Sequence, residues 1–547
     1  MEKMNRRSFI RLMGAAGIAS TLNPWNTAGV NTDKRSNILV ITSDQHHPRI
    51  TGYLGHPYVQ TPSLDGLAAD GTIFRHAYCA SPICTPSRAS FLTGQYVHKN
   101  RTWMIGIPTD PGIMTWPKRL TQADYVTAAY GKMDLSGKYQ NPGFNDFITF
   151  ERRPAFYPYP LDSPYDPRLT GYVRPDKRRH ILDAGSNTEA RRMLSEKYGQ
   201  DDFLFRFADH RVLGFNSHDR EVTELALQFL RRERRMQRGK PWALYLGYLQ
   251  PHWPFRVPQK YFDMYYPDAL EWPYDAHFPN ENLHQEICHF QKALGLNDIP
   301  SDAIRGTIAA YYGMVTCLDE LISVVIQELK NLGMYETTYI IYTSDHGESL
   351  GEHGLFYKQC SYEGSVGVPL IVKGPNIPKG KVIHHPVSLV DEYPTIMEMA
   401  SLNTGDDCQG HSWLPIIQDD FSNYPEYAFS EFHGNFIRQS WYMLVRDSYK
   451  YTYYSNQLRP SLFNIVEDPQ EKQDLVPRRT HEKILKDFEE LLHSILDPEK
   501  TAFESKRDLG LIGSNGEDFT ISLTQQALVE GRKSGLYRPK YKRGFIN

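Results

Sequence analysis

Short apolar runs recur along this chain, each too short for a helix and each followed by polar residues. They cover residues 37–42, 125–130, 242–249, 338–343 and 369–372. Because their apolar residues are nearly continuous rather than alternating, these runs indicate strands buried on both faces. Helical patterns lie between them, most clearly over residues 302–332, where apolar residues repeat with a period of 3.6 and Gly333 ends the pattern. The alternation predicts an α/β fold with a large mixed, mostly parallel sheet flanked by helices.

The pattern changes from about residue 400. Strand-like segments at 427–431, 442–445, 449–454 and 462–465 have no helix between them, and a helical pattern covers 481–496. They predict a smaller antiparallel α+β subdomain. For a chain of 547 residues, we expect an α/β domain over residues 35–400 and a C-terminal subdomain with a tail over 401–547. Three domains of equal size are the competing arrangement.

The composition excludes several classes of protein. With 61 basic and 64 acidic residues, the chain has no charge excess that would attract nucleic acid, so we expect no nucleic-acid partner. Six cysteines are too few for a disulfide scaffold in a chain of this length. A cysteine therefore becomes interesting only through its neighbours.

Residues 1–30 have the pattern of an export signal. Arg6 and Arg7 precede a short stretch of small apolar residues over 12–22, which is too short to span a bilayer. Paired arginines before a weakly apolar segment are similar to a bacterial twin-arginine signal. We expect export of the folded protein by the twin-arginine machinery to the periplasm or beyond, without a stable membrane span. A disordered N-terminal extension is the alternative.

Polar side chains follow four of the expected strands, where ligands bind in open α/β sheets. They are Asp44 and Gln45, Lys132 and Asp134, His252, and Asp345 and His346. Asp44, Gln45, Asp345 and His346 supply mostly oxygen ligands, which favours Ca²⁺ or Mg²⁺ over zinc. The alternative is that both aspartates only cap the segments that follow. Clustered carboxylates repel one another unless a cation lies between them, which favours the metal site.

Residues 84–88 read Cys-Thr-Pro-Ser-Arg. Thr85 is expected to cap a helix and Pro86 to lie in its first turn, which places Cys84 at a helix N-terminus. There the backbone N–H groups and the helix dipole stabilise an anion, and Arg88 can turn back to the same point. The alternative is an ordinary buried cysteine, which is how Cys317 reads.

Cys84 to Arg88 resembles the Cys-x-Pro-Ser-Arg signature of type I sulfatases, formylglycine-dependent members of the alkaline phosphatase superfamily. The resemblance extends over residues 37–476. Its further motifs are Asp44-Gln45, Gly131-Lys132, Pro251-His252-x-Pro254-Phe255, Ser344-Asp345-His346-Gly347-Glu348, Gly351-x-His353-Gly354, Lys358, Tyr362-Glu363-Gly364, Leu462-Phe463-Asn464, Glu467-Asp468-Pro469 and Glu471.

The resemblance implies an alkaline phosphatase-like fold and a role for each site residue. It implies that a formylglycine-generating or sulfatase-maturing enzyme oxidises Cys84 to formylglycine, whose hydrate is the nucleophile. The implied ligands of Ca²⁺, with Mg²⁺ as the other candidate, are Asp44, Gln45, the modified Cys84, Asp345 and His346. The implied groups around the sulfate are Arg88, Lys132, His252 and Lys358. Such cations stabilise charge in the transition state, and His252 or Lys358 could protonate the departing alcohol.

Two positions depart from the family pattern. Asp134 stands where family members usually have a histidine, and it is expected to bind a basic or hydroxyl group of the substrate or to point away. Some relatives place a sulfate-contacting asparagine near position 105, where this chain has Ile105. Asn100 is a loose substitute for it and a second candidate substrate-binding residue.

The sequence therefore predicts a sulfuric ester hydrolase, with a small-molecule or oligosaccharide sulfate ester as its substrate. An aromatic content of 13% and the Arg- and Tyr-rich segment 151–180 favour a sulfated carbohydrate, although aromatic residues also pack cores. A phosphodiesterase or phosphonate monoester hydrolase of the same superfamily is one alternative. A catalytically silent protein that binds sulfated glycans is the other, motivated by Asp134.

Overall fold

The computed structural model describes residues 35–137, 139–149, 217–236, 239–253, 255, 257–266, 283–294, 301–434, 439–477 and 479–512. The expected export signal over 1–30 and the segment 151–180 lie outside these residues. Residues 36–547 form one compact unit, separate from residues 1–35. The account below concerns the described part of that unit.

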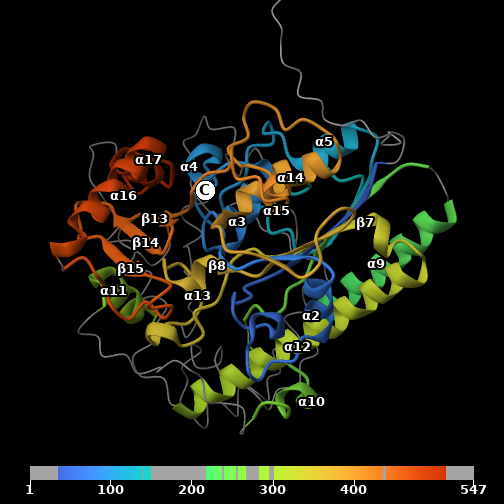
Figure 1. The fold of residues 1–547 in the computed structure, drawn as a ribbon, viewed down its shortest axis with the longest axis horizontal. Coiled ribbons are helices and arrows are strands. Elements are labelled where there is room, and N and C mark those ends of the chain that lie inside the picture. The colour runs from blue at the N-terminus through green and yellow to red at the C-terminus, as the bar shows by residue number, and fades with distance from the viewer. Residues whose placement is uncertain are drawn as a thin grey trace, which may run out of the picture. The chain divides into compact units, whose positions relative to one another are not determined.

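An eight-stranded sheet lies at the centre of the fold (Figure 1). Its strands are, in spatial order, β10 (Lys381–Ile383), β2 (Thr72–Phe74), β9 (Leu370–Lys373), β7 (Thr338–Ser344), β1 (Asn37–Ser43), β6 (Trp242–Gly247), β4 (Val126–Gly131) and β5 (Asp146–Ile148). All neighbours are parallel except that β9 runs antiparallel to β2 and β7. The predicted mixed, mostly parallel sheet is confirmed, and the five predicted runs are β1, β4, β6, β7 and β9.

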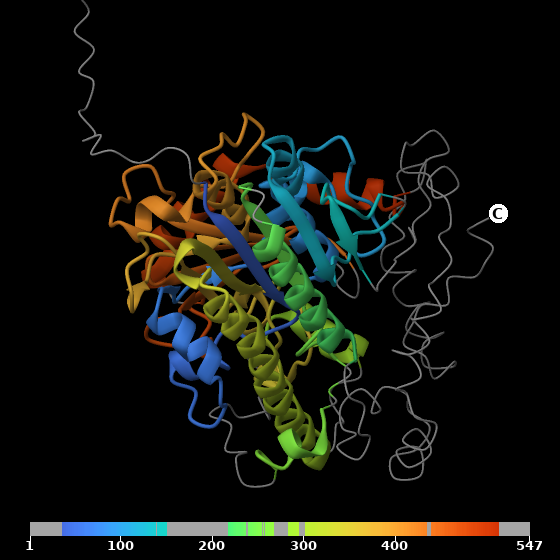
Figure 2. The same ribbon diagram turned by 90° about the vertical axis from the view of Figure 1, so that its right-hand side faces the viewer.

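Alternate residues of each central strand enter two different cores. Leu39 and Ile41 of β1 pack with helices α2 (Pro62–Ala69), α9 (Ser217–Met236) and α12 (Ser301–Asn331). Ile38 and Val40 pack on the other face with α3 (Cys84–Thr93), α5 (Trp116–Gln122) and α14 (Glu392–Met399). Figure 2 shows α9 and α12 side by side along one face of the sheet. Burial on both faces explains why these strands read as continuous apolar runs.

Helix α12 is the predicted helix of residues 302–332. Its segment Ile304–Asn331 is the one helix among the described residues with the length and apolar composition to cross a membrane. Most of that segment is buried inside the protein. Its apolar surface therefore packs on the sheet and on α9, as in the core helix of a globular domain.

Two smaller sheets accompany the central one. The first consists of β11 (Val387–Ser388), β3 (Ala77–Tyr78) and β8 (Gly367–Val368). The second is antiparallel and consists of β12 (Tyr427–Phe432), β13 (Trp441–Arg446), β14 (Tyr449–Tyr454) and β15 (Ser461–Asn464). Phe488 and Leu492 of helix α16 (Glu482–Ile495) pack on apolar residues of this antiparallel sheet, and α17 (Pro498–Asp508) follows. The predicted antiparallel α+β region is confirmed, while its boundary at 401 stays a prediction.

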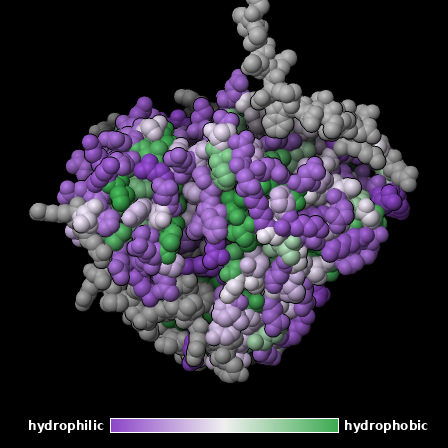
Figure 3. Space-filling model, in the orientation of Figure 1, coloured by the Kyte–Doolittle hydropathy of each residue, from purple (hydrophilic) through white to green (hydrophobic). Residues whose placement is uncertain are grey.

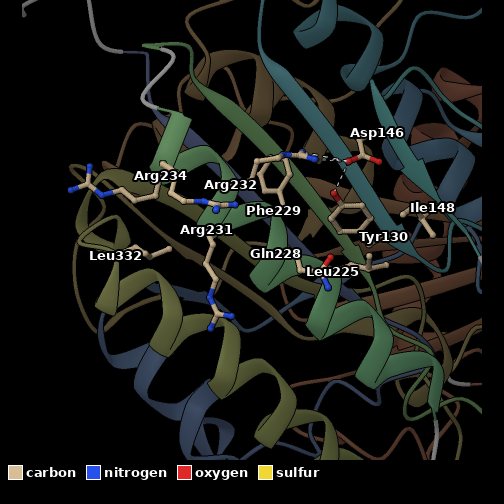
Figure 4. Close-up of a pocket in the computed structure, with 11 residues that line it drawn as sticks. Tyr130, Asp146, Ile148, Leu225, Gln228, Phe229, Arg231, Arg232, Arg234 and Leu332 are labelled. Atoms are coloured by element: carbon tan, nitrogen blue, oxygen red, sulfur yellow. Dashed lines mark hydrogen bonds and ion pairs between the residues drawn. The ribbon is translucent and has the colours of Figure 1, made fainter.

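The surface in Figure 3 is mostly hydrophilic, and its apolar residues form separated clusters. A pocket of about 720 Å³ lies beside α9 (Figure 4). Its rim carries Arg231, Arg232, Arg234 and Arg235, and Arg232 and the Tyr130 hydroxyl both bond to Asp146. The residues that line this pocket include none of the predicted site residues.

Candidate active site

Four side chains that could bind a metal ion converge at the carboxyl end of the central strands. Asp44 follows β1, Asp345 and His346 follow β7, and Cys84 begins α3. Because β1 and β7 are parallel neighbours, their carboxyl ends lie side by side. One ligand atom from each of the four residues lies within 4.8 Å of the others, and all four residues are buried.

Cys84 is the first residue of α3, but Thr85 does not cap the helix. The N-cap residue is Ile83, and no side chain caps the helix there. The Thr85 hydroxyl already lies in the first turn, and it donates to the carbonyl of Asp134 at 2.8 Å. The predicted cap was therefore wrong, and Thr85 instead ties α3 to the loop that follows β4.

The surroundings of Cys84 disfavour a thiolate. Its Sγ lies 3.3 Å from Nε2 of His346 and 3.6 Å from Nζ of Lys132. Burial, and after it the charge of Asp44, raise the pKa of the Cys84 thiol to about 12. An unmodified Cys84 is therefore protonated near neutral pH and is a poor nucleophile.

Arg88 lies one turn into α3 and is fully buried. Its Nε donates to Asp345 at 2.8 Å, and its Nη2 donates to Asp44 at 3.3 Å. Its Nη1 donates to the carbonyl of Lys132 at 2.8 Å and to the Tyr245 hydroxyl at 2.9 Å. The guanidinium thus bridges the two carboxylates of the site and fixes their separation.

Lys132 follows β4 and extends its ammonium group into the site. Its Nζ contacts Asp44 and lies 3.6 Å from Sγ of Cys84. Its backbone N–H donates to the carbonyl of Gly247 at 2.7 Å. A Cβ atom on Gly247 would lie 2.0 Å from the Lys132 carbonyl oxygen, so only glycine at the end of β6 permits this approach.

Gln45 has a left-handed backbone with a φ of 66°. The hydroxyl of Tyr311 holds this turn, because it donates to the Gln45 carbonyl at 2.6 Å and accepts from the amide of His47 at 2.8 Å. The side-chain amide of Gln45 lies between Lys358 and Glu348, and it bonds to both.

His252 lies on the most open side of the site. Its Nε2 is 3.9 Å from Oδ1 of Asp44, and 12% of its side chain is exposed, whereas the Asp44 side chain is fully buried. The ring stacks on Trp253 with centroids 5.3 Å apart. Burial, and then the charge of Lys358, lower the pKa of His252 well below its ordinary value. His252 is therefore neutral near pH 7 and can accept a hydrogen bond there.

The structure places the two candidate substrate-binding residues differently. Oδ2 of Asp134 lies 3.7 Å from Nζ of Lys132, so this carboxylate belongs to the site. Asn100 ends the short helix α4 (Val97–Asn100), and its amide donates to Ser90 at 3.2 Å and to the carbonyl of Gln95 at 2.9 Å. These bonds tie Asn100 to α3 and to the turn before α4 rather than to the four converging side chains.

The charges around Asp44 keep it ionised. Burial alone would raise its pKa, but the charges of Lys132 and Arg88 hold the pKa well below its ordinary value. His346 is the opposite case, since burial lowers its pKa to about 4 and leaves the imidazole neutral. The site therefore combines the ionised carboxylate of Asp44 with the neutral imidazole of His346, and both are in the form that binds metals.

The direction of the His346 ring fits a cation at the centre of the group. Its Nδ1 lies 2.9 Å from the Gly347 carbonyl, which requires a proton on Nδ1. The lone pair on Nε2 then faces Asp44 and Asp345, whose oxygens lie 3.8 and 3.6 Å away. Arg88 already bridges the two carboxylates, and the Nε2 lone pair beside them completes a set of three acceptors that suits a cation.

Several contributors have no role in the sequence prediction. In the sequence, Glu348 is only part of a family motif, and Tyr245 and Tyr311 lie within the apolar patterns of 242–249 and 302–332. Their hydroxyls act through single hydrogen bonds to Arg88 and Gln45. A buried strand pattern carries no signal for such a bond.

Comparison with known families identifies this combination of fold and site. The family model described as Sulfatase matches residues 36–402, and the model described as N-sulphoglucosamine sulphohydrolase, C-terminal, matches residues 351–497. The chain belongs to the sulfatase family. It is a type I sulfatase, an enzyme that hydrolyses sulfate esters, as the sequence motifs predict.

Curated relatives include arylsulfatase K from several vertebrates. The chain is 29% identical to arylsulfatase K of Danio rerio over 488 residues, which cover 85% of this chain and 84% of the relative. It is 28% identical to the protein of Homo sapiens over 491 residues, covering 86% and 84%. The similarity therefore spans both the central sheet and the antiparallel region.

Solved structures share the fold at lower identity. A phosphonate monoester hydrolase of Agrobacterium radiobacter matches with a TM-score of 0.64 and 21% identity, covering 84% of this chain and 95% of that one. BT4656 in complex with its substrate D-glucosamine-2-N,6-O-disulfate matches with a TM-score of 0.61 and 20% identity, covering 87% and 98%. BT1596, a 2-O GAG sulfatase, matches with a TM-score of 0.60 and 18% identity, covering 88% and 94%.

Proposed function

We propose that this sulfatase releases sulfate from a sulfated carbohydrate by means of a formylglycine residue formed from Cys84. The position of Cys84 carries the proposal. It begins α3, touches His346 and Lys132, and lies in the four-residue group that fits a cation. Its high thiol pKa argues against an unmodified cysteine as the nucleophile.

The carbohydrate substrate is supported by the relatives rather than by the pocket itself. One matching structure contains a disulfated glucosamine as its substrate, and another is a 2-O GAG sulfatase. The C-terminal match is to a sulphohydrolase of N-sulphoglucosamine. A sulfated sugar is the substrate class that these names share.

Ca²⁺, with Mg²⁺ as the other candidate, would be held by Asp44, Gln45, Asp345 and His346. When bound, the cation offsets the charge of sulfate oxygens and makes a neighbouring hydroxyl more acidic. A formylglycine hydrate supplies that hydroxyl, and a second hydroxyl that allows sulfate to leave without attack of water at sulfur.

The protein's own cations bind and orient the sulfate. Lys132 contacts Asp44 and Lys358 contacts Gln45, and both ammonium groups attract the anion and stabilise charge in the transition state. Arg88 acts through the carboxylates that it bridges. Because His252 is neutral near pH 7, the Lys358 ammonium is favoured as the donor of a proton to the departing alcohol, and His252 as an acceptor.

Maturation and location complete the proposal. A formylglycine-generating or sulfatase-maturing enzyme would convert Cys84, and the twin-arginine machinery would export the folded protein to the periplasm. The support is the residue pattern of 84–88 and of 1–30.

Mass spectrometry of the peptide that contains Cys84, from protein made in a host with a maturing enzyme, tests the mechanism. We expect the mass of formylglycine, sulfate release by the wild type, and no release by Cys84→Ala. Cys360→Ala is the matched control, because it removes another buried cysteine. An unmodified thiol together with activity that survives Cys84→Ala would contradict the mechanism.

A second test concerns the metal. We expect purified protein to contain one calcium ion and Asp345→Asn to lose it, since the substitution removes a ligand charge. Stoichiometric calcium retained by Asp345→Asn would contradict the ligand set. Elemental analysis after gel filtration provides the measurement.

A phosphodiesterase or phosphonate monoester hydrolase is the second candidate, because a phosphonate monoester hydrolase shares the fold with a TM-score of 0.64. The ratio of kcat/KM on an aryl sulfate and on an aryl phosphodiester separates the two functions. A higher value on the phosphodiester would contradict the sulfatase assignment. Binding of sulfated oligosaccharide without sulfate release, when Cys84 is modified, would indicate the silent glycan-binding protein instead.

A further inference from the structure

Glu348 is a buried carboxylate two residues beyond His346, and the mechanism above gives it no role. Its Oε1 accepts from the backbone amides of Leu350 at 2.9 Å and Tyr357 at 2.5 Å. Its Oε2 accepts from the side-chain amide of Gln45. Both carboxylate oxygens thus accept hydrogen bonds, and the three donors come from two separate segments of the chain.

These contacts determine the direction of the Gln45 amide. A carboxylate only accepts hydrogen bonds, so the NH₂ group of Gln45 must face Glu348. The amide oxygen then lies on the other side, where it accepts from the ammonium of Lys358. The reversed amide would place two acceptors against each other and the NH₂ group against an ammonium.

The same carboxylate closes the loop of residues 350–357, which leads directly to Lys358. By accepting from Leu350 and Tyr357 it joins both ends of residues 350–357, next to a backbone bond from Ser349 to the Tyr357 carbonyl at 2.7 Å. Gln45 and Lys358 therefore both depend on this one residue.

We propose that Glu348 is a positioning residue that turns the oxygen of the Gln45 amide towards Lys358 and the cation site. Without it, only the ammonium of Lys358 would favour this direction, and the amide would present NH₂ to the cation in a larger part of the molecules. The inference rests on the proposed function only in assuming that Gln45 faces a bound cation.

The first test is the calcium affinity of Glu348→Gln, measured by isothermal titration of the full chain. The glutamine has the same shape and still accepts from the two backbone amides with its oxygen. Its NH₂ group then faces Gln45 and forces that amide to reverse. We expect calcium to bind about 10 to 100 times more weakly, the usual effect of losing a residue that orients a ligand.

The second test exchanges the two side chains. In the double variant Gln45→Glu with Glu348→Gln, a carboxylate at position 45 accepts from the glutamine and offers its other oxygen to the cation, so neither group needs to reverse. The total charge equals that of the wild type. We expect the double variant to recover most of the calcium affinity that the single variant loses.

Glu352→Gln is the matched control. Glu352 is another buried glutamate of the same loop, but its carboxylate bonds to His47 and Arg49. We expect this variant to lower the thermal unfolding temperature and to leave calcium affinity unchanged, so loss of affinity in Glu348→Gln cannot be general damage to the loop.

Two results would overturn the proposal. One is wild-type calcium affinity in Glu348→Gln, and the other is a double variant that binds calcium no better than the single one. Wild-type protein that binds calcium but releases no sulfate would instead contradict the proposed function, and the comparison of calcium affinities would still decide the role of Glu348.

Discussion

Replacement of Arg88 tests whether its guanidinium is what allows two buried carboxylates to lie together. The guanidinium donates to Asp345 at 2.8 Å and to Asp44 at 3.3 Å, and all three side chains are fully buried. Hydrogen bonds to charged groups contribute about 1.5–3 kcal/mol each, and removing one partner of a buried ion pair costs about 3–5 kcal/mol. We expect Arg88→Met to lower the free energy of unfolding of the metal-free protein by about 3–5 kcal/mol.

Arg88→Lys is the matched variant, because it keeps the positive charge but lacks the planar fork that reaches both carboxylates. Arg88→Lys should lower the free energy of unfolding by less, about 1–3 kcal/mol. Urea unfolding followed by fluorescence measures both variants, with and without calcium.

Calcium should stabilise Arg88→Met more than the wild type, since the ion offsets the same two carboxylates that lose their arginine. A loss below about 1 kcal/mol in both metal-free variants would refute the view that Arg88 holds the carboxylates together.

Three other positions have measurable consequences. Burial lowers the pKa of His284 from 6.5 to about 4, and its Nδ1 accepts from the amide of Glu286 at 3.2 Å. The unfolded chain therefore binds a proton first as the pH falls, so a stabilisation of up to about 3 kcal/mol is present above pH 6.5 and is lost towards pH 4. In urea unfolding, His284→Gln should flatten this pH dependence. Gly247→Ala should cost about 1–3 kcal/mol, because its Cβ meets the carbonyl of Lys132, and it should lower kcat for sulfate release. Asn100→Ala should cost about 1–3 kcal/mol through its lost buried hydrogen bonds, yet leave the KM of an aryl sulfate unchanged.

Each of these results has a clear opposite. An unchanged pH profile in His284→Gln would mean that the ring is not a neutral acceptor. Full activity in Gly247→Ala would mean that the ends of β4 and β6 can separate without moving Lys132. A raised KM in Asn100→Ala would restore this residue to the substrate site.

The central strands could be predicted because long apolar runs buried on both faces have few other solutions. The expected strand at 338–343 is β7, Thr338–Ser344, and the helix expected at 302–332 is α12, Ser301–Asn331. Strands of two or three residues, such as β3 and β8, were not predicted, because pairing with neighbours defines them rather than their own sequence.

The position of the site could be predicted for a similar reason, since the carboxyl ends of parallel strands meet at one edge of the sheet. What the sequence could not supply is which side chain bonds to which. Thr85 bonds to the loop after β4 rather than capping α3, and Asn100 bonds to α3 and to the turn before α4. Such choices depend on distances of a few ångströms between segments that are far apart in the chain.

The burial of Cys84 bears on whether its proposed maturation would come before or after folding. Only 1% of the residue is exposed. Its Sγ lies 3.3 Å from Nε2 of His346 and 3.6 Å from Nζ of Lys132. A second enzyme cannot close its own active site around a side chain that is already enclosed. The proposed oxidation of Cys84 would therefore have to precede folding, and a molecule that folds first would keep the thiol. The fraction of active protein in a preparation would then depend on the relative rates of maturation and folding.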